Sequence, residues 1–321
     1  MGVAMLAAFA PCVYSADAHL ANAPANNGQH TQDATFTFNE FLVPQQNFTL
    51  PFYLFNAHIL IDGAVNGKPG KFMFDTGTEF AFFLNNHFLP LSKDQFIGQG
   101  HAGSGQEMLL YRQNTPVDSL EIAGQIRFEN VADFLHTDWG FIEQAYTPNF
   151  LGSIGHGFNR NYVFVIDYDA QTLTFHALNQ DEAAIASIID PARLVAILHF
   201  TPKGVDGKMP EVEMRIGKET LNVFFDTGSQ GALELTETMK NRLEDQGKLS
   251  LSLSQYLYGT YETHLRASLT GLSYDAKNLQ EARNLSFKIG TQNRVGLGYH
   301  FLKNYVSVWD YKHSTLTLLK P

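Results

Sequence analysis

The sequence is poor in cysteine, in positive charge and in long apolar runs. Cys12 is the single cysteine among 321 residues, so no internal disulfide can form and stability must come from a buried core. The formal net charge of −10 argues against the basic face of a nucleic-acid-binding protein. No stretch of about 20 apolar residues follows the N-terminal segment, so we expect no transmembrane segment in the mature chain.

The sequence lacks the motifs of several classes of enzyme. The 12 histidines show no H-x-H or H-E-x-x-H spacing, so we expect no metal site and no cofactor. No Gly-x-Ser-x-Gly occurs. Cys12 lies within the N-terminal segment, which leaves the mature chain without a thiol nucleophile. The glycines at positions 98–105 lack the lysine and the following helix of a phosphate-binding loop.

The N-terminal residues differ in composition from the rest. Residues 3–10 form a short apolar run that small residues follow, which is typical of a secretory signal peptide, here placed at residues 1–23. The alternative is a disordered, Ala-rich N-terminus. Residues 24–45 are interpreted as a flexible leader, because the chain there is rich in polar and small residues without periodicity. We therefore predict an exported protein, periplasmic or secreted.

Two apolar stretches end in nearly the same polar residues. Residues 72–74 and 223–225 are apolar, and an acid follows each of them. A buried acid costs free energy unless something stabilises it, so its occurrence twice predicts that the two acids meet. The two motifs are Asp75, Thr76, Gly77 and Thr78 in the first half, and Asp226, Thr227, Gly228 and Ser229 in the second.

A longer repeat supports this pairing. Residues 154–175 align without a gap with residues 297–318 at a constant offset of 143, and 11 of the 22 positions are identical. The offset between the two acids is larger, 226 − 75 = 151, so the second half is shorter in its middle by eight positions. We expect loops and flaps there. The pattern predicts two similar halves that arose by duplication.

Short apolar or alternating runs, separated by turns rich in Gly, Asn and Pro, predict strands through most of both halves. One capped surface helix is expected at residues 236–243. The first half is placed at residues 46–178 and the second at residues 199–321. Residues 179–198 are interpreted as the connection between them.

The Asp-Thr-Gly turn has a chemical rationale. Its glycine lets the backbone turn sharply and bring an N–H to the carboxylate, and its threonine hydroxyl can bond to the opposite loop. The hydroxyls of Thr78 and Ser229 can reach the outer carboxylate oxygens. Two carboxylates about 3 Å apart cannot both ionise, so they share one proton. Such a pair can accept a proton from a bound water and donate one to a carbonyl.

The paired motifs resemble those of aspartic peptidases of the pepsin and retropepsin type, and the cysteine-free halves are similar to bacterial tandem retropepsin-like proteins. Ser153-Ile154-Gly155 and Gly296-Leu297-Gly298 match in part the family's hydrophobic-hydrophobic-Gly segment, which in the family lies behind the catalytic loop. Ser153 and Gly296 depart from it at the first apolar position. The resemblance covers residues 50–321 and implies a mainly β fold with two similar β-barrel lobes and a cleft between them.

The resemblance further implies that Asp75 and Asp226 are catalytic, with the other residues of both motifs in supporting roles. A candidate flap comprises Gly100, His101, Gly103 and Gly105, where the density of glycine predicts a mobile hairpin tip. A solvated loop histidine is the simpler interpretation of His101.

The expected function is that of a monomeric aspartic endopeptidase, which hydrolyses peptide or protein substrates with a water activated between the two acids. The alternative is a catalytically silent module that keeps the fold and binds a peptide or protein. A local role for Asp75 and Asp226 as turn caps would not explain the duplication. Asp167 and Asp310 each precede a tyrosine and a polar turn, and we expect them to be structural.

Overall fold

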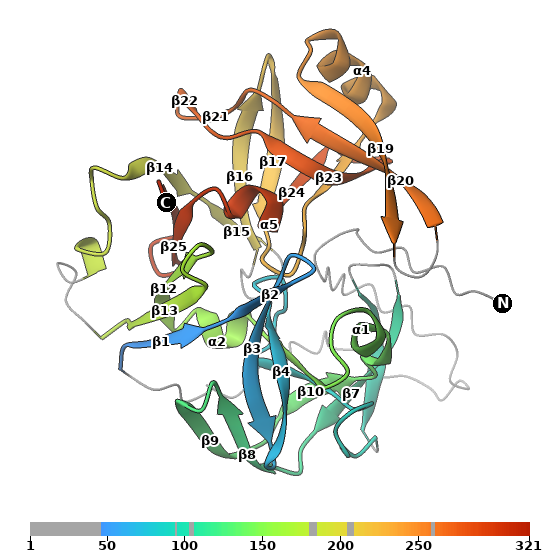
Figure 1. Ribbon diagram of the computed structural model, residues 1–321, viewed down its shortest axis with the longest axis vertical. Helices are drawn as coiled ribbons and strands as arrows, with labels where there is room; N and C mark the ends of the chain where they lie inside the picture. Colours follow the sequence, from blue (N-terminus) through green and yellow to red (C-terminus); the bar gives the residue numbers. More distant parts are fainter. Residues whose placement is uncertain (1–45, 94, 103–105, 180–184, 204–208, 258–260) are drawn as a thin grey trace, which may run out of the picture.

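The computed structural model describes residues 46–93, 95–102, 106–179, 185–203, 209–257 and 261–321. This part of the chain is mainly β, as the sequence predicts. It contains two large, curled ten-stranded sheets and one six-stranded sheet. In Figure 1 one ten-stranded sheet lies above the other, and the six-stranded sheet lies to their left. The expected signal peptide at 1–23 and leader at 24–45 lie outside the described residues.

The first ten-stranded sheet is formed by the first half of the chain. Its strand order is β6-β7-β10-β5-β11-β4-β3-β8-β9, and β2 pairs with β3. The strands are β2 (Tyr53–Phe55), β3 (His58–Val65), β4 (Lys68–Phe74), β5 (Phe82–Asn85), β6 (Phe96–His101), β7 (Glu107–Gln113), β8 (Val117–Ile122), β9 (Ile126–Val131), β10 (Phe134–Thr137) and β11 (Phe150–Ile154).

The second ten-stranded sheet has the order β19-β20-β23-β18-β24-β17-β16-β21-β22, and β15 pairs with β16. Adding 13 to each strand number of the first sheet gives this order, so the sequence repeat extends to the topology of the sheets. The strands are β15 (Thr201–Lys203), β16 (Met209–Ile216), β17 (Glu219–Phe225), β18 (Ala232–Leu235), β19 (Leu249–Leu257), β20 (Tyr261–Leu269), β21 (Leu272–Tyr274), β22 (Lys277–Asn278), β23 (Ala282–Ile289) and β24 (Arg294–Leu297).

The six-stranded sheet joins the two halves. Its order is β1-β13-β12-β25-β26-β14, so each half contributes three adjacent strands. The strands are β1 (Phe48–Pro51), β12 (Tyr162–Asp167), β13 (Thr172–Ala177), β14 (Leu194–His199), β25 (Val306–Asp310) and β26 (Thr315–Leu319). The expected connection at 179–198 therefore ends in a strand, because β14 adds its backbone hydrogen bonds to the edge of this sheet.

The two copies of the repeat pair with each other at the centre of this sheet. β12 and β25 are antiparallel, with Val165 opposite Val308, and these two residues occupy equivalent positions because 165 + 143 = 308. Phe164 lies opposite Trp309, and their rings stack with centroids 5.6 Å apart. The register thus relates the two halves by a local two-fold arrangement.

The described helices are short. They are α1 (Gly140–Ala145), α2 (His156–Asn159), α4 (Glu237–Asp245) and α5 (Tyr299–Leu302). The capped surface helix expected at 236–243 is confirmed, since the hydroxyl of Thr236 accepts the N–H of Met239 at 3.3 Å at the start of α4. None of the helices in the described part of the chain is long and apolar enough to cross a membrane.

The difference in length between the halves falls mostly at α1. Thr137 and Lys288 hold equivalent places in the strand registers of the two sheets. From there to the next strand the chain covers positions 138–149 in the first half and only positions 289–293 in the second. A bulge at Leu151 in β11 accounts for the rest of the difference. The extra segment therefore adds a helix to the first half alone.

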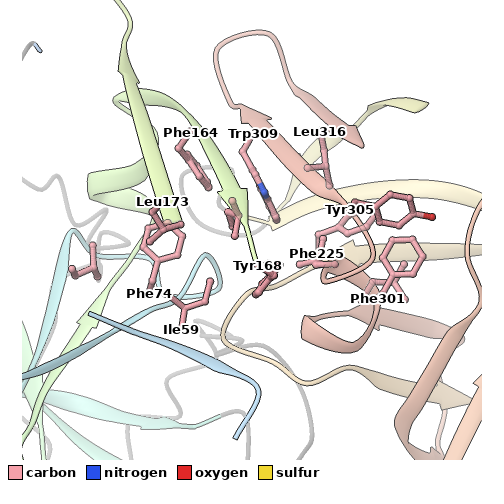
Figure 2. Close-up of a cluster of buried hydrophobic side chains, with 14 of the residues drawn as sticks. Ile59, Phe74, Phe164, Tyr168, Leu173, Phe225, Phe301, Tyr305, Trp309 and Leu316 are labelled. Atoms are coloured by element: carbon pink, nitrogen blue, oxygen red, sulfur yellow. The ribbon is translucent and has the colours of Figure 1, made fainter. Parts of the chain in front are cut away.

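The strands that lead to the acids are apolar for a structural reason. β4 lies between β3 and β11, and β17 lies between β16 and β24. Both strands are buried on both faces over their last three residues, and a strand of that kind has a continuous apolar run rather than an alternating one. Figure 2 shows Phe74 and Phe225, the last residues of these strands, in the apolar core that also contains Phe164 and Trp309.

We predict that Trp309→Ala lowers the free energy of unfolding by about 3–5 kcal/mol, because it removes a fully buried ring and leaves a cavity between the halves. Urea unfolding followed by far-UV circular dichroism measures this loss. Leu253→Ala is the control, since that side chain is 72% exposed and its loss should change the midpoint little. Equal midpoints for the wild type and Trp309→Ala would contradict the packing described for the six-stranded sheet.

Candidate active site

The two acid loops occupy matching places in the two sheets. Each acid follows the last residue of a strand whose neighbour is parallel to it, β11 beside β4 and β24 beside β17. The N–H of Asp75 donates to the carbonyl of Ile154 at 2.9 Å, and the N–H of Asp226 donates to that of Leu297 at 3.2 Å. The same backbone bond therefore anchors both acids to their sheets.

The threonines of the two motifs bond to each other's loops. The N–H of Thr76 donates to Oγ1 of Thr227 at 3.0 Å, and the N–H of Thr227 donates to Oγ1 of Thr76 at 3.0 Å. The Thr227 hydroxyl in turn donates to the carbonyl of Phe74 at 3.1 Å. Both threonines are fully buried. The structure thus brings together two motifs that lie far apart in the sequence, through the hydroxyls expected to do so.

Each carboxylate is held by its own loop. The N–H of Gly77 donates to Oδ1 of Asp75 at 2.8 Å, and the N–H of Gly228 donates to Oδ1 of Asp226 at 2.8 Å. Oδ2 of Asp75 accepts the hydroxyl of Thr78 at 2.7 Å. Asp75 is only 6% exposed and Asp226 only 1%, so these donors offset part of the cost of burying the two groups.

Each carboxylate also packs against the glycine of the opposite loop. A Cβ atom added at Gly77 would lie 2.8 Å from Oδ1 of Asp226, and one added at Gly228 would lie 2.8 Å from Oδ2 of Asp75 and closer still to Oδ1. A side chain at either position would therefore displace a carboxylate. The close approach explains why both motifs carry glycine and shows that the two acids share one site.

Ser229 stands where Thr78 stands in the first loop. Its Oγ accepts the N–H of Gly231 at 3.1 Å, so this hydroxyl holds the turn that follows the second loop. The expectation that a hydroxyl donates to the outer carboxylate oxygen is confirmed for Thr78 and Asp75.

Backbone from the partial hydrophobic-hydrophobic-Gly segments supports the loops from behind. A Cβ at Gly155 would collide with the carbonyl of Thr78, and one at Gly298 would collide with that of Ser229. The residue that follows each segment donates its N–H to the same carbonyl. His156 donates to Thr78 at 2.7 Å, and Tyr299 donates to Ser229 at 2.9 Å. Both segments therefore lie behind the acid loops, where the resemblance places them.

The departure at Gly296 also has a cause. A Cβ at Gly296 would lie 2.6 Å from the ring of Phe224, so that ring fills the space that an apolar side chain would take. The sequence alone does not show that the ring of Phe224 replaces the missing side chain of Gly296, because Phe224 belongs to the neighbouring strand.

Two tyrosines near the acids are a feature that the sequence reasoning did not assign to the site. Tyr168 and Tyr311 are equivalent positions of the repeat, since 168 + 143 = 311. Burial raises the pKa of both hydroxyls well above the ordinary value, and the charge of Asp226 adds to the rise. Their identity in both copies of the repeat was the available signal.

These tyrosines connect the halves. Each ring meets the first residue of a short helix in the other half at a steep angle, Tyr168 against Tyr299 with centroids 5.4 Å apart and Tyr311 against His156 at 4.6 Å. The two contacts are again equivalent by the offset of 143. These tyrosines therefore form a second contact between the halves.

The candidate flap is only partly described. Gly100 and His101 lie in β6, which pairs with β7 in an antiparallel hairpin, and His101 is exposed. Gly103 and Gly105 lie outside the described residues. The hairpin itself is thus present, while the role of its tip stays a prediction.

Asp167 and Asp310 have the structural role expected of them. Oδ1 of Asp167 accepts the N–H groups of Asp169 and Ala170 in the turn between β12 and β13, and Oδ1 of Asp310 accepts the N–H of His313 in the equivalent turn. Among the described residues, no group of three or more His, Cys, Asp or Glu side chains is placed to hold a metal ion.

Comparison of the sequence with protein-family models and with curated proteins finds no match. The family resemblance therefore rests on the paired motifs and on the repeat.

We predict that Thr227→Val lowers the free energy of unfolding by about 1–3 kcal/mol, because it leaves the buried N–H of Thr76 without its acceptor. Thr49→Val is the matched control. It removes one side of an exposed hydrogen bond between threonine hydroxyls, Thr49 to Thr174 at 3.1 Å, and should cost much less. Chemical denaturation of the wild type and the two variants measures both effects. Equal losses of unfolding free energy would contradict a greater contribution of the buried bonds between the loops.

Proposed function

We propose that the protein is an aspartic endopeptidase of the pepsin or retropepsin type, with Asp75 and Asp226 as its catalytic pair. One observation carries the proposal. Each of these two carboxylates packs against the glycine of the other's loop, while the intervening threonines exchange hydrogen bonds. Turn caps that act locally would have no need of contacts with a loop so distant in the sequence.

The proposed fold comprises two similar β-barrel lobes, built on the two ten-stranded sheets, with the substrate cleft between them. The common strand order of the sheets and the two-fold register of the six-stranded sheet support this arrangement. The acid loops would then lie at the base of the cleft, where the two sheets come closest.

The proposed mechanism uses the pair as both base and acid. The ionised carboxylate accepts a proton from a water bound between the acids, and the water oxygen bonds to the carbonyl carbon of the substrate. The protonated carboxyl donates its proton to the carbonyl oxygen, which gives a tetrahedral diol. The carboxyl group that took the water proton then donates it to the amide nitrogen, while the other carboxylate accepts a proton from one diol hydroxyl. The C–N bond breaks, which yields a carboxylic acid and an amine and restores the singly protonated pair. Fixed N–H and hydroxyl donors hold the pair for these steps.

An apolar cluster beside Asp75 points to the kind of substrate. The face of the first sheet opposite the main core carries a small apolar cluster. Trp139, just before α1, and Phe141 and Ile142 in α1 complete this cluster. Met73 belongs to this cluster and lies two residues before Asp75, and the half-buried Phe80 packs against it two residues after Thr78. Phe80 is only half-buried, so we infer that it contacts a large apolar residue of the peptide on one side of the scissile bond.

The equivalent face of the second sheet differs. Ser286 takes the place of Leu135, and Ala232 takes the place of Phe83, as the strand registers show. The two sides of the proposed site are therefore unlike, and at these two positions the first sheet has the larger apolar side chain.

We predict that Asp75→Asn and Asp226→Asn, made singly, each lower kcat by roughly 10²–10⁴-fold, because the pair loses either its base or its acid. Cleavage of a denatured protein or a peptide library at mildly acid pH, followed by mass spectrometry, measures this. Asp167→Asn is the control, since that acid serves only its own turn and its loss should leave kcat unchanged. Near-full activity in either test variant would refute the shared pair.

The same experiment separates the alternative function. If the wild type cleaves no peptide at any acid or neutral pH, and a variant with both acids replaced retains the same peptide or protein partner, the chain is a silent binding module with the fold of a peptidase.

We predict that Phe80→Ala raises KM about fivefold, equivalent to about 1 kcal/mol of lost apolar contact, for peptides with Phe or Leu beside the scissile bond. Peptides with a polar residue there should be unaffected. Steady-state kinetics on paired peptides tests this, with Ile289→Ala as the control, because that side chain is 46% exposed on the second sheet. An equal change for both peptide classes would argue against the apolar cluster as a binding site.

A further inference from the structure

A buried histidine contacts the loop of one acid. His58 is the first residue of β3 and is only 5% exposed. Its Nδ1 lies 2.8 Å from the carbonyl oxygen of Asn56, and its Nε2 lies 3.1 Å from that of Gly228. The ring meets the ring of Tyr146 edge-on, with centroids 4.7 Å apart. His58 thus joins the turn before β3 to the acid loop of the other half.

Gly228, like Gly77 in the other loop, lies between the two acids. Its N–H donates to Asp226, and its Cα faces the carboxylate of Asp75. His58 holds the carbonyl of this same residue. A change in this hydrogen bond should move Gly228, and with it the carboxylates of Asp226 and Asp75 that Gly228 contacts.

The second hydrogen bond of the turn reinforces the contact. The side-chain amide of Gln230 donates to the carbonyl of Asn56 at 3.0 Å, and Asn56 has a positive φ of 54°. The carbonyl of Asn56 therefore accepts a hydrogen bond from Gln230 of the second half and lies within hydrogen-bond distance of His58 of the first half. The tight turn presents this carbonyl to both.

The charge of His58 determines how many of these bonds form. A neutral imidazole has one N–H and can donate to only one of the two carbonyls, whereas the protonated ring donates to both. Burial lowers the pKa of His58, while the carbonyl of Asn56, the charge of Asp75 and the carbonyl of Gly228 oppose that effect. His300 of α5 is the neighbouring base, and burial with the charges of Lys303, Arg266 and His58 lowers its own pKa to about 4.

The repeat supplies an internal comparison. Met209 is the first residue of β16 and corresponds to His58, since 58 + 151 = 209, and it is also buried. The fold therefore accepts an unbranched apolar side chain at this place. The histidine is a feature of the first half alone, and the architecture does not require it.

We propose that His58 is a positioning residue of the carboxylate pair, which holds the Asp226 loop through the carbonyl of Gly228 and strengthens that hold when it is protonated. The role in catalysis rests on the function proposed above. His58 touches no substrate in this role, so its loss should act on kcat and not on KM.

The kinetic test uses His58→Met, which copies the second half, and His58→Gln, whose amide N–H can donate to the carbonyl of Gly228 without titrating. We expect His58→Met to lower kcat about tenfold with KM unchanged, because a misplaced catalytic group costs rate rather than binding. His58→Gln should recover most of the loss. The ratio of wild-type to His58→Met kcat should grow as the pH falls toward the pKa of folded His58, which burial lowers from the ordinary value of about 6.5. A constant ratio, or an unchanged kcat in His58→Met, would overturn the proposal.

The stability of the wild type relative to His58→Met should fall at low pH, whereas its relative kcat should rise. Because the pKa of His58 is lowered in the folded state, the unfolded chain binds a proton more readily. The wild type therefore loses stability relative to His58→Met as the pH falls through about 6.5. Urea unfolding of both proteins at neutral and mildly acid pH measures the difference. The same difference at both pH values would contradict the buried, titrating state of His58.

A measurement without substrate separates this inference from the proposed function. In NMR titrations, the imidazole signal of His58, assigned by its absence in His58→Met, should report a lower pKa in Asp75→Asn than in the wild type. Asp275→Asn, at an exposed turn, is the control and should leave it unchanged. If no peptide is cleaved but the signal responds to Asp75, the enzymatic function fails and the coupling stands. If peptides are cleaved and the signal ignores Asp75, the positioning role fails.

Discussion

The site depends on the pair of hydrogen bonds that Thr76 and Thr227 exchange. Each bond joins a hydroxyl to the N–H of a residue in the other half of the chain, in a fully buried place. Because an acid directly precedes each threonine, these bonds fix the carboxylates relative to each other. Any movement of one loop against the other that breaks such a bond would leave a buried N–H unpaired, at a cost of about 1–3 kcal/mol.

The two-fold relation of the threonines recurs at the pairing of Val165 with Val308, and α1 and His58 are two of the departures from it. The helix α1 occurs only in the first half, and His58 corresponds to Met209. A peptide has a direction, so a site that binds it in one orientation needs two unlike sides. In the function proposed above, duplication would provide the paired acids, and these one-sided features would provide the difference between the sides.

The paired acids, the contact between their loops, the duplication and the mainly β fold could be predicted, because each leaves a repeated pattern in the sequence. The features that escaped prediction have no such pattern. The position of α1 as the main difference between the halves depends on strand registers, and β14 extends a sheet whose other strands are distant in sequence. His58 is a lone histidine in an apolar strand, and its importance comes from a carbonyl in the other half of the chain.

The threonine and the glycine of the Asp-Thr-Gly motif are determined by the opposite copy rather than by their own turn. The threonine is needed because its hydroxyl accepts an N–H of the other loop, and the glycine is needed because the other carboxylate occupies the place of a side chain. The acid is tolerated in a buried site because its loop supplies donors. A single copy of the tripeptide meets neither of the first two requirements. Two copies at matching places in a repeat satisfy them together, and this is why the pair is informative where one motif is not.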